Sequence, residues 1–194
     1  MIPQTLLPIV VGGGVLLLII YANRHRGGKV KAVLEPLAQR KGGRVGEPGL
    51  FSYPKLTYQV DNVEIEMFSR PGSRNSPPFT YVRFQRQSQL KFSIYNESFV
   101  SSLGKMIGLS EIQINNREFD DAFVLKSDSE MMFRQLLTAN LQQKILPLKN
   151  MRPNIQLKDG RFELRIPKIP NTEMEYEVLL SAAEGFIAEL KRLM

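Results

Sequence analysis

The chain has 194 residues, of which 43% are hydrophobic, and a formal charge of +7, so it can bury a core and is not expected to be disordered. It contains no cysteine, and its single histidine is His25. This composition excludes disulfides, thiolate nucleophiles and cysteine metal sites, and beyond residue 25 it excludes histidine-based catalysis within the chain. We predict no catalytic, cofactor-binding or metal-ligating residues, and no cofactor.

The positive charge is concentrated near the N terminus. Residues 24–44 hold seven Lys or Arg and one acid, whereas residues 45–194 hold 19 basic and 18 acidic side chains. A nucleic-acid-binding domain is expected to carry a basic face of its own. We therefore expect no nucleic-acid partner.

An uncharged apolar run extends from Leu6 to Ala22. Its 17 residues span roughly 25 Å as a helix, close to the thickness of a bilayer core. No basic residue precedes the run, and Asn23-Arg24-His25-Arg26 follows it, which argues against a cleaved signal peptide. We predict a transmembrane anchor over residues 1–23.

Basic residues flank this run only on its C-terminal side, and such residues mark the cytoplasmic side of a membrane. The prediction is a single-pass protein of the cell inner membrane, with its N terminus outside and its C-terminal domain in the cytoplasm, in contact with membrane lipids. The expected membrane contacts are Leu6, Ile9, Val10, Leu16, Leu17, Ile20, Tyr21, Arg24, Arg26, Lys29 and Lys31.

Residues 24–48 are predicted to form a basic juxtamembrane helix and a linker. The helix is expected over residues 29–40, with Val30, Leu34 and Leu37 on one side, although Pro36 disfavours it. Gly42-Gly43 ends it. A soluble domain is expected over residues 49–194.

The domain opens with a predicted β-hairpin. In residues 56–60 and 63–67 apolar and polar side chains alternate, as in strands with one buried face, and Asp61-Asn62 between them is typical of a tight turn. Residues 70–78, rich in Pro, Ser and Gly, are expected to form a flexible loop.

Two further hairpins are predicted. One joins residues 79–86 to residues 90–95. The other joins residues 155–157 to residues 162–166 across Asp159-Gly160, the clearest turn signal in the chain. A single strand is expected near residues 122–126.

Helices are predicted over residues 99–107, 127–138 and 141–150, and at the C terminus. Ser127 with Glu130, and Thr172 with Glu175, match the capping box that begins a helix. The last helix has a continuous apolar face and must pack on a partner. The predicted fold is an α+β domain, with an antiparallel sheet covered by helices and a long C-terminal helix.

The run from Glu118 to Leu125 (EFDDAFVL), followed by a capped helix, an alternating hairpin and a terminal helix, resembles an element of uncharacterised bacterial membrane-anchored proteins. The resemblance covers about residues 110–194 and rests on a short motif. It implies a bacterial membrane protein and suggests no mechanism.

Three groups of side chains are candidates for a functional role. Carboxylates suited to a hard cation or to acid–base chemistry gather at Glu118, Asp120, Asp121, Asp128 and Glu130. Arginines suited to an acidic partner or to lipid headgroups are Arg70, Arg74, Arg83 and Arg86. The aromatic side chains interleaved with these bases are Phe79, Tyr81, Phe84 and Phe92, which we assign to the core in preference to base stacking.

The leading hypothesis is a non-enzymatic, membrane-anchored interaction module that serves as an accessory subunit or tether of a membrane complex at the cytoplasmic face. The alternative is a lipid- or small-ligand-binding domain, with a cavity between the sheet and the last helix. A second alternative is a carboxylate- or metal-dependent enzyme.

Overall fold

The computed structural model describes residues 25–49, 52–96 and 109–193. The predicted anchor and the helix expected over residues 99–107 lie outside these ranges. Within them, no helix combines the length and the hydropathy needed to cross a bilayer.

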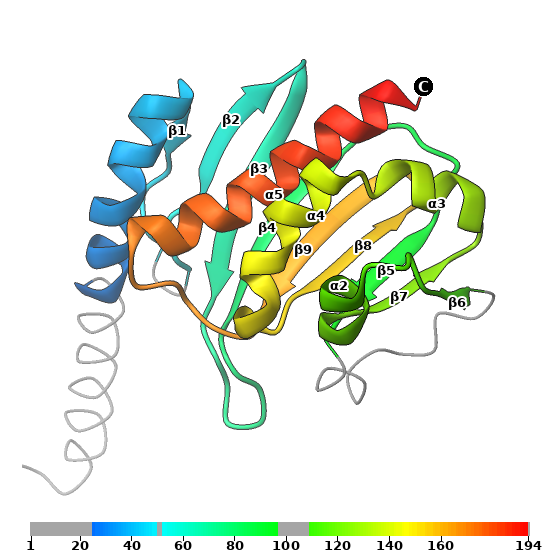
Figure 1. Ribbon diagram of the computed structural model, residues 1–194. Coiled ribbons are helices and arrows are strands. Elements are labelled where there is room, and N and C mark those ends of the chain that lie inside the picture. Colours follow the sequence, from blue (N-terminus) through cyan, green and yellow to red (C-terminus); the bar gives the residue numbers. More distant parts are fainter. Residues whose placement is uncertain (1–24, 50–51, 97–108, 194) are drawn as a thin grey trace, which may run out of the picture.

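A single antiparallel sheet organises the described residues (Figure 1). Its strand order is β1-β2-β3-β4-β9-β8-β5-β7-β6, which confirms the predicted antiparallel sheet. The strands are β1 (Arg44–Val45), β2 (Leu56–Val60), β3 (Val63–Arg70), β4 (Phe79–Gln85), β5 (Phe92–Tyr95), β6 (Ser110–Ile112), β7 (Val124–Ser127), β8 (Asn154–Lys158) and β9 (Arg161–Ile166).

Two of the three predicted hairpins are present. Asp61 and Asn62 join β2 to β3 with φ values of 49° and 61°, and Asp159 and Gly160 join β8 to β9 with φ values of 50° and 73°. Two consecutive positive φ angles define the turn whose twist matches that of the strands. Asp, Asn and Gly tolerate this conformation, which is why the turns were evident from the sequence.

The predicted hairpin between residues 79–86 and 90–95 is wrong. Strand β4 pairs with β3 and β9, whereas β5 pairs with β8 and β7. The β8–β9 hairpin lies between them in the sheet. Leu90, Phe92 and Ile94 are buried as the alternation predicted, but alternation does not specify which strand is the neighbour.

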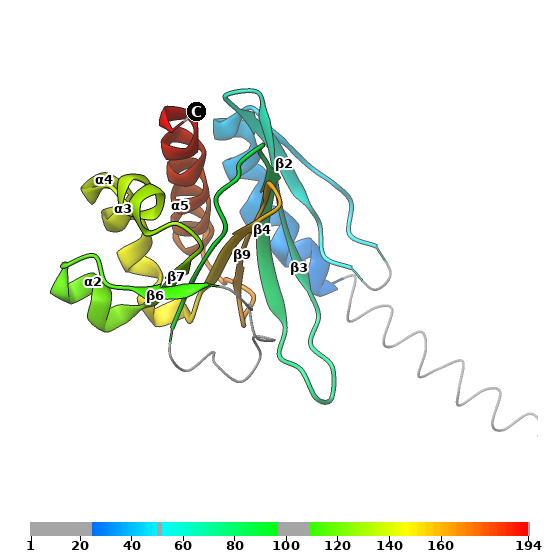
Figure 2. The same ribbon diagram turned by 90° about the vertical axis from the view of Figure 1, so that its right-hand side faces the viewer.

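The helices form a layer on one face of the sheet (Figure 2). Among the described helices the longest is α5, which begins after Thr172 and covers the core with nine buried residues, which confirms the predicted C-terminal helix. The layer contains α2 (Arg117–Ala122), α3 (Glu130–Leu136), α4 (Ala139–Ile145), the 3-10 helix η2 (Leu146–Met151) and α5 (Glu173–Arg192).

Residues 25–41 form a further helix, here called the N-terminal helix. Its side chains Val30, Leu34, Leu37 and Ala38 belong to the same hydrophobic core as the sheet and α5. The helix continues through Pro36, which is exposed, because burial of the opposite side outweighs the lost hydrogen bond. We expected the folded unit to begin at residue 49. The N-terminal helix shares its core, so the folded unit begins before that residue.

The capping residue of α3 differs from the prediction. Ser129, not Ser127, precedes the helix, and its hydroxyl accepts a hydrogen bond from the Met132 amide at 3.4 Å. Ser127 ends strand β7, where its hydroxyl donates to the Lys91 carbonyl at 3.0 Å. Two serines, two residues apart, could have capped the helix. Ser127 is held in strand β7 by its pairing with β5, so Ser129 is the cap.

Candidate interaction surface

One face of β2, β3, β4 and β9 carries no helix of the described part of the chain (Figure 2). The register places Glu66, Arg83, Glu163 and Gln156 side by side on β3, β4, β9 and β8. Arg83 Nε donates to Glu163 Oε2 at 2.8 Å, and Lys55 Nζ to Glu66 Oε1 at 2.6 Å. The charges of this row are thus largely compensated within the sheet.

A hollow of about 1010 Å³ lies over this row. Its lining contains acidic, basic and amide side chains in similar proportion, so it does not select a ligand of one charge. The polar residues that line it are Glu64, Glu66, Arg83, Gln85, Gln156, Lys158, Asp159, Arg161 and Glu163.

Next to the row, arginines lie against aromatic rings. Phe68 and Tyr81 are paired across β3 and β4, and their rings stack with centroids 5.2 Å apart. The Arg70 guanidinium lies 5.4 Å from the Tyr81 ring centroid, and that of Arg83 lies 4.8 Å from it. We call Phe68, Arg70, Phe79, Tyr81, Arg83 and Arg165 the arginine–aromatic patch.

The aromatic rings hold the guanidinium groups on the surface of the sheet. A cation over the face of a ring is attracted by about 0.5–1 kcal/mol at an exposed site. Arg83 also pairs with Glu163, with Nη2 2.6 Å from Oε2. Arg70 is exposed and makes no ion pair with another described residue. Its N–H groups are therefore oriented and available to an acidic group from outside the domain.

The structure separates the four arginines predicted to contact a partner. Arg70 and Arg83 meet in the patch, and Arg74 lies beyond Arg70 in the connection between β3 and β4. Arg86 follows the other end of β4, where its amide donates to the Gly160 carbonyl at 2.8 Å. Their role as partner contacts stays a prediction.

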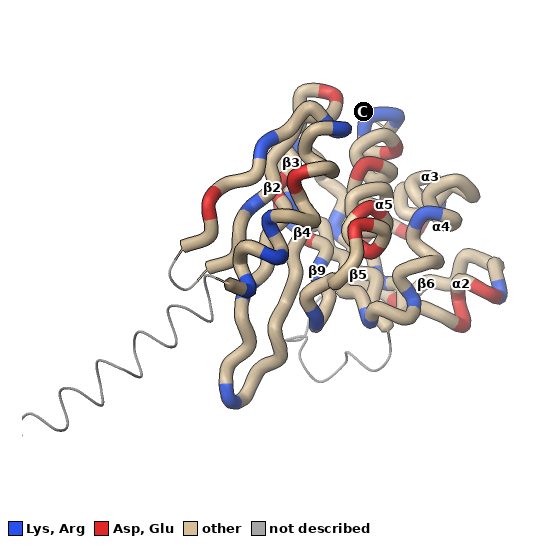
Figure 3. The backbone as a smooth tube through the Cα atoms, turned by 90° about the vertical axis from the view of Figure 1, so that its left-hand side faces the viewer, with Lys and Arg blue, Asp and Glu red and all other residues tan. Residues whose placement is uncertain are grey.

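Most of the segment expected to be a flexible loop, residues 70–78, connects β3 to β4, and a bridge closes the end of this hairpin. Ser73 and Ser76 form an isolated antiparallel bridge, with an N–H···O bond of 2.8 Å from Ser73. A Cβ on Gly72 would lie 2.9 Å from the Ser76 carbonyl oxygen, so the backbones approach closely. Arg74 is exposed and lies between the two bridged serines, and Figure 3 shows basic residues at the tip of this hairpin.

The bases predicted to face the membrane have different surroundings. Arg26 and Lys29 are exposed on the N-terminal helix. Lys31 Nζ pairs with Glu47 and lies 3.7 Å from Glu35, and the hydrogen bond to Glu47 raises the pKa of Lys31. Arg24 and the apolar contacts predicted between Leu6 and Tyr21 lie outside the described residues.

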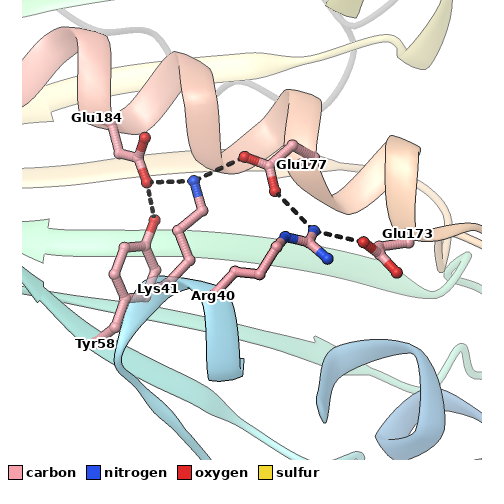
Figure 4. Close-up of polar contacts among 6 residues, drawn as sticks. All are labelled: Arg40, Lys41, Tyr58, Glu173, Glu177 and Glu184. Carbon is pink, nitrogen blue, oxygen red and sulfur yellow. Dashed lines mark hydrogen bonds and ion pairs between the residues drawn. The ribbon is translucent and has the colours of Figure 1, made fainter. Parts of the chain in front are cut away.

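A polar cluster that the sequence did not reveal joins the N-terminal helix to α5 (Figure 4). Lys41 Nζ lies 2.7 Å from Glu177 and 2.9 Å from Glu184, and the Tyr58 hydroxyl donates to Glu184 at 2.7 Å. Arg40 pairs with Glu173 on the next turn toward the start of α5. We call these six residues, Arg40, Lys41, Tyr58, Glu173, Glu177 and Glu184, the helix-pairing cluster.

Burial and charge act in opposite directions on Lys41. Partial burial lowers the pKa of its ammonium group, but hydrogen bonds to Glu177 and Glu184 outweigh that effect and raise it. Burial, then the bond to Glu184, raises the pKa of Tyr58. Lys41 therefore stays charged and Tyr58 stays neutral at physiological pH, which fixes the pattern of donors and acceptors in the cluster.

The candidate carboxylates have structural partners. Asp120 accepts from the amides of Ile114 and Asn116 at 3.0 and 3.2 Å, and Asp128 accepts from that of Lys91 at 2.9 Å. The other three make ion pairs, Glu118 with Lys149, Asp121 with Arg117 and Glu130 with Arg134. Over the described ranges, no three His, Cys, Asp or Glu side chains gather to hold a metal ion.

The interleaved aromatic residues divide between the two faces of the sheet. Phe84 and Phe92 belong to the core, as expected. Phe79 and Tyr81 lie instead in the arginine–aromatic patch. A strand directs alternate residues to opposite faces, so one aromatic run serves both the core and the surface.

The fold and the patch together define an antiparallel α+β domain with one helix-covered face and one arginine-rich face. Neither a protein-family profile nor a curated protein gives a significant match to the sequence. The fold is similar to the crystal structure of the mycobacterial trehalose monomycolate transport factor A, TtfA, with a TM-score of 0.58. That match covers 85% of this chain and 96% of TtfA at 9% identity. At such low identity it shows a shared fold alone.

Proposed function

We propose that this protein is a non-enzymatic accessory subunit or tether of a membrane complex, anchored by residues 1–23 with its domain on the cytoplasmic side. The arginine–aromatic patch would hold an acidic segment of a protein partner. The observation that carries the proposal is Arg70, an exposed guanidinium oriented by Phe68 and Tyr81 on a rigid sheet. The fold neighbour is described as a transport factor, which is compatible with an accessory role.

The chemistry of the patch favours a protein partner. Arginine and aromatic side chains are enriched among the residues that contribute most to interface affinity. A guanidinium in a fixed orientation binds a carboxylate through two parallel hydrogen bonds. The patch lies on strands with neighbours on both sides, so binding requires little ordering of the backbone.

The core between the sheet and α5 does not favour a ligand carrier. Phe186 on α5 lies 5.4 Å from Phe92 and 5.0 Å from Phe162, measured between ring centroids. Phe162 in turn stacks on Phe84 at 4.3 Å. These rings fill the space in which we expected a cavity for the alternative function.

The proposal is tested by extracting the full-length chain from membranes with a mild detergent and measuring the size of its complex. We expect a defined assembly larger than the monomer, which Arg70→Gln reduces. Arg134→Gln, which removes the same charge from α3 on the helix-covered side, is the matched control and leaves the assembly intact. A monomeric wild type, or an assembly that Arg70→Gln does not change, would contradict the proposal.

A further inference from the structure

Two separate parts of the chain lie at the same end of the domain. The closed hairpin between β3 and β4 projects toward the end where the N-terminal helix begins, as Figures 1, 2 and 3 all show. Strand β3 carries the chain to that end, over about 24 Å from Val63 to Arg70. The tip of this hairpin, where Arg74 lies between the bridged Ser73 and Ser76, is therefore far from the β2–β3 turn and on the same side of the domain as the start of the N-terminal helix.

This end of the domain is also the end nearest the predicted anchor. A Cβ on Gly27 would lie 2.7 Å from Pro48 Cβ, so the start of the N-terminal helix is fixed against the body of the domain. Gly27 follows the apolar run by only five residues, a path of at most about 18 Å. A membrane that holds the apolar run must lie within that distance of this end.

The charge at this end is positive. Arg26, Lys29 and Arg74 are exposed, and no described residue makes an ion pair with them. Residues 70–78 contain two arginines and no acid. Glu47, which precedes the Pro48 that lies against Gly27, is paired with Lys31. We call Arg26, Lys29 and Arg74 the basic end.

We propose that the basic end is a second membrane contact, at which the β3–β4 hairpin binds the anionic lipid surface and fixes the orientation of the domain. This inference rests on the proposed function, since it requires the anchor. The closed turn and the close approach at Gly72 order the tip before contact, so docking costs little conformational entropy. Each basic side chain near an anionic leaflet is expected to favour the docked state about fivefold.

The absence of cysteine from the chain allows a direct test. The full-length chain with Asn75→Cys is labelled with a fluorophore at the hairpin tip and reconstituted in vesicles that contain spin-labelled headgroups. We expect quenching in vesicles of phosphatidylcholine with phosphatidylglycerol, and less in phosphatidylcholine alone or at high salt. Arg74→Gln should lower the ratio of docked to undocked tips about fivefold.

Two controls separate this inference from the proposed function. The first control is a label at Gln59→Cys, an exposed residue of β2 away from the tip, which should stay unquenched. The second control is Arg161→Gln, at the start of β9, which should not change the quenching of the label at the tip. An unquenched tip on a chain that floats with the vesicles would refute the inference alone. An unquenched tip on a floating chain is also the result expected if Arg74 contacts an acidic protein in place of lipid. A chain that does not float would refute the proposed anchor as well.

Discussion

Replacing Lys41 with Met tests whether the helix-pairing cluster holds the N-terminal helix on the domain. Methionine keeps most of the apolar stem and removes the ammonium group. The change breaks the contacts of 2.7 Å to Glu177 and 2.9 Å to Glu184. It leaves Glu184, whose side chain is 23% exposed, with Tyr58 as its remaining partner in the cluster.

The expected magnitude follows from these contacts. A hydrogen bond to a charged group contributes about 1.5–3 kcal/mol when buried, and partial exposure reduces that contribution. The Lys41 side chain is 18% exposed, so we expect Lys41→Met to lower the free energy of unfolding by about 2 kcal/mol. For a domain of this size, that corresponds to a decrease in Tm of about 4–8 °C.

The assay is thermal unfolding of the full-length chain in detergent, followed by circular dichroism. Arg134→Met is the matched control, because its ion pair with Glu130 is 39% and 62% exposed and should contribute less than about 1 kcal/mol. Because the pKa of Lys41 is raised on folding, its contribution is complete below the unfolded pKa and is lost as pH rises through the folded pKa. Equal decreases in Tm for both variants would refute this assignment.

Two further predictions concern the packing and capping of the fold. Gly43→Ala should destabilise the domain by about 2 kcal/mol, because the new Cβ would lie 2.6 Å from the Thr57 carbonyl oxygen. Gly28→Ala, with nothing within 4 Å, is its control, and urea unfolding measures both. The hydrogen bond to Lys168 lowers the pKa of Glu175, so its stabilisation is present above the unfolded pKa and lost as pH falls through the folded pKa. Glu175→Gln should therefore flatten the acid side of the pH–stability profile, and an unchanged profile would contradict this.

Local interactions explain which parts of the fold were predictable. Asp61-Asn62 and Asp159-Gly160 determine their turns through their own backbone preferences. Thr172 accepts from the Glu175 amide at 3.3 Å, as the capping pattern predicts, and the Glu175 carboxylate accepts from the amide of Asn171 at 2.7 Å. All of these contacts lie within four residues along the chain.

The site depends on pairings between distant residues, which local patterns do not encode. Arg70 reaches Tyr81 because β3 and β4 pair with Arg70 opposite Phe79, and a different register would separate them. Lys41 and Glu184 are 143 residues apart. Lys41 lies in the basic run of residues 24–44 beside the predicted anchor, whereas in the structure it pairs with Glu177 and Glu184 on α5. Individual residues were recognisable as candidates, but their grouping was not.

Crosslinking tests directly whether the arginine–aromatic patch binds a protein partner at the membrane. A photo-crosslinking amino acid replaces Phe79 in the full-length chain in native membranes. The same amino acid in place of Gln143, exposed on α4, is the control. We expect one adduct of defined mass from position 79, reduced by Arg70→Gln and not formed from position 143. No adduct from position 79, or equal adducts from both positions, would contradict it.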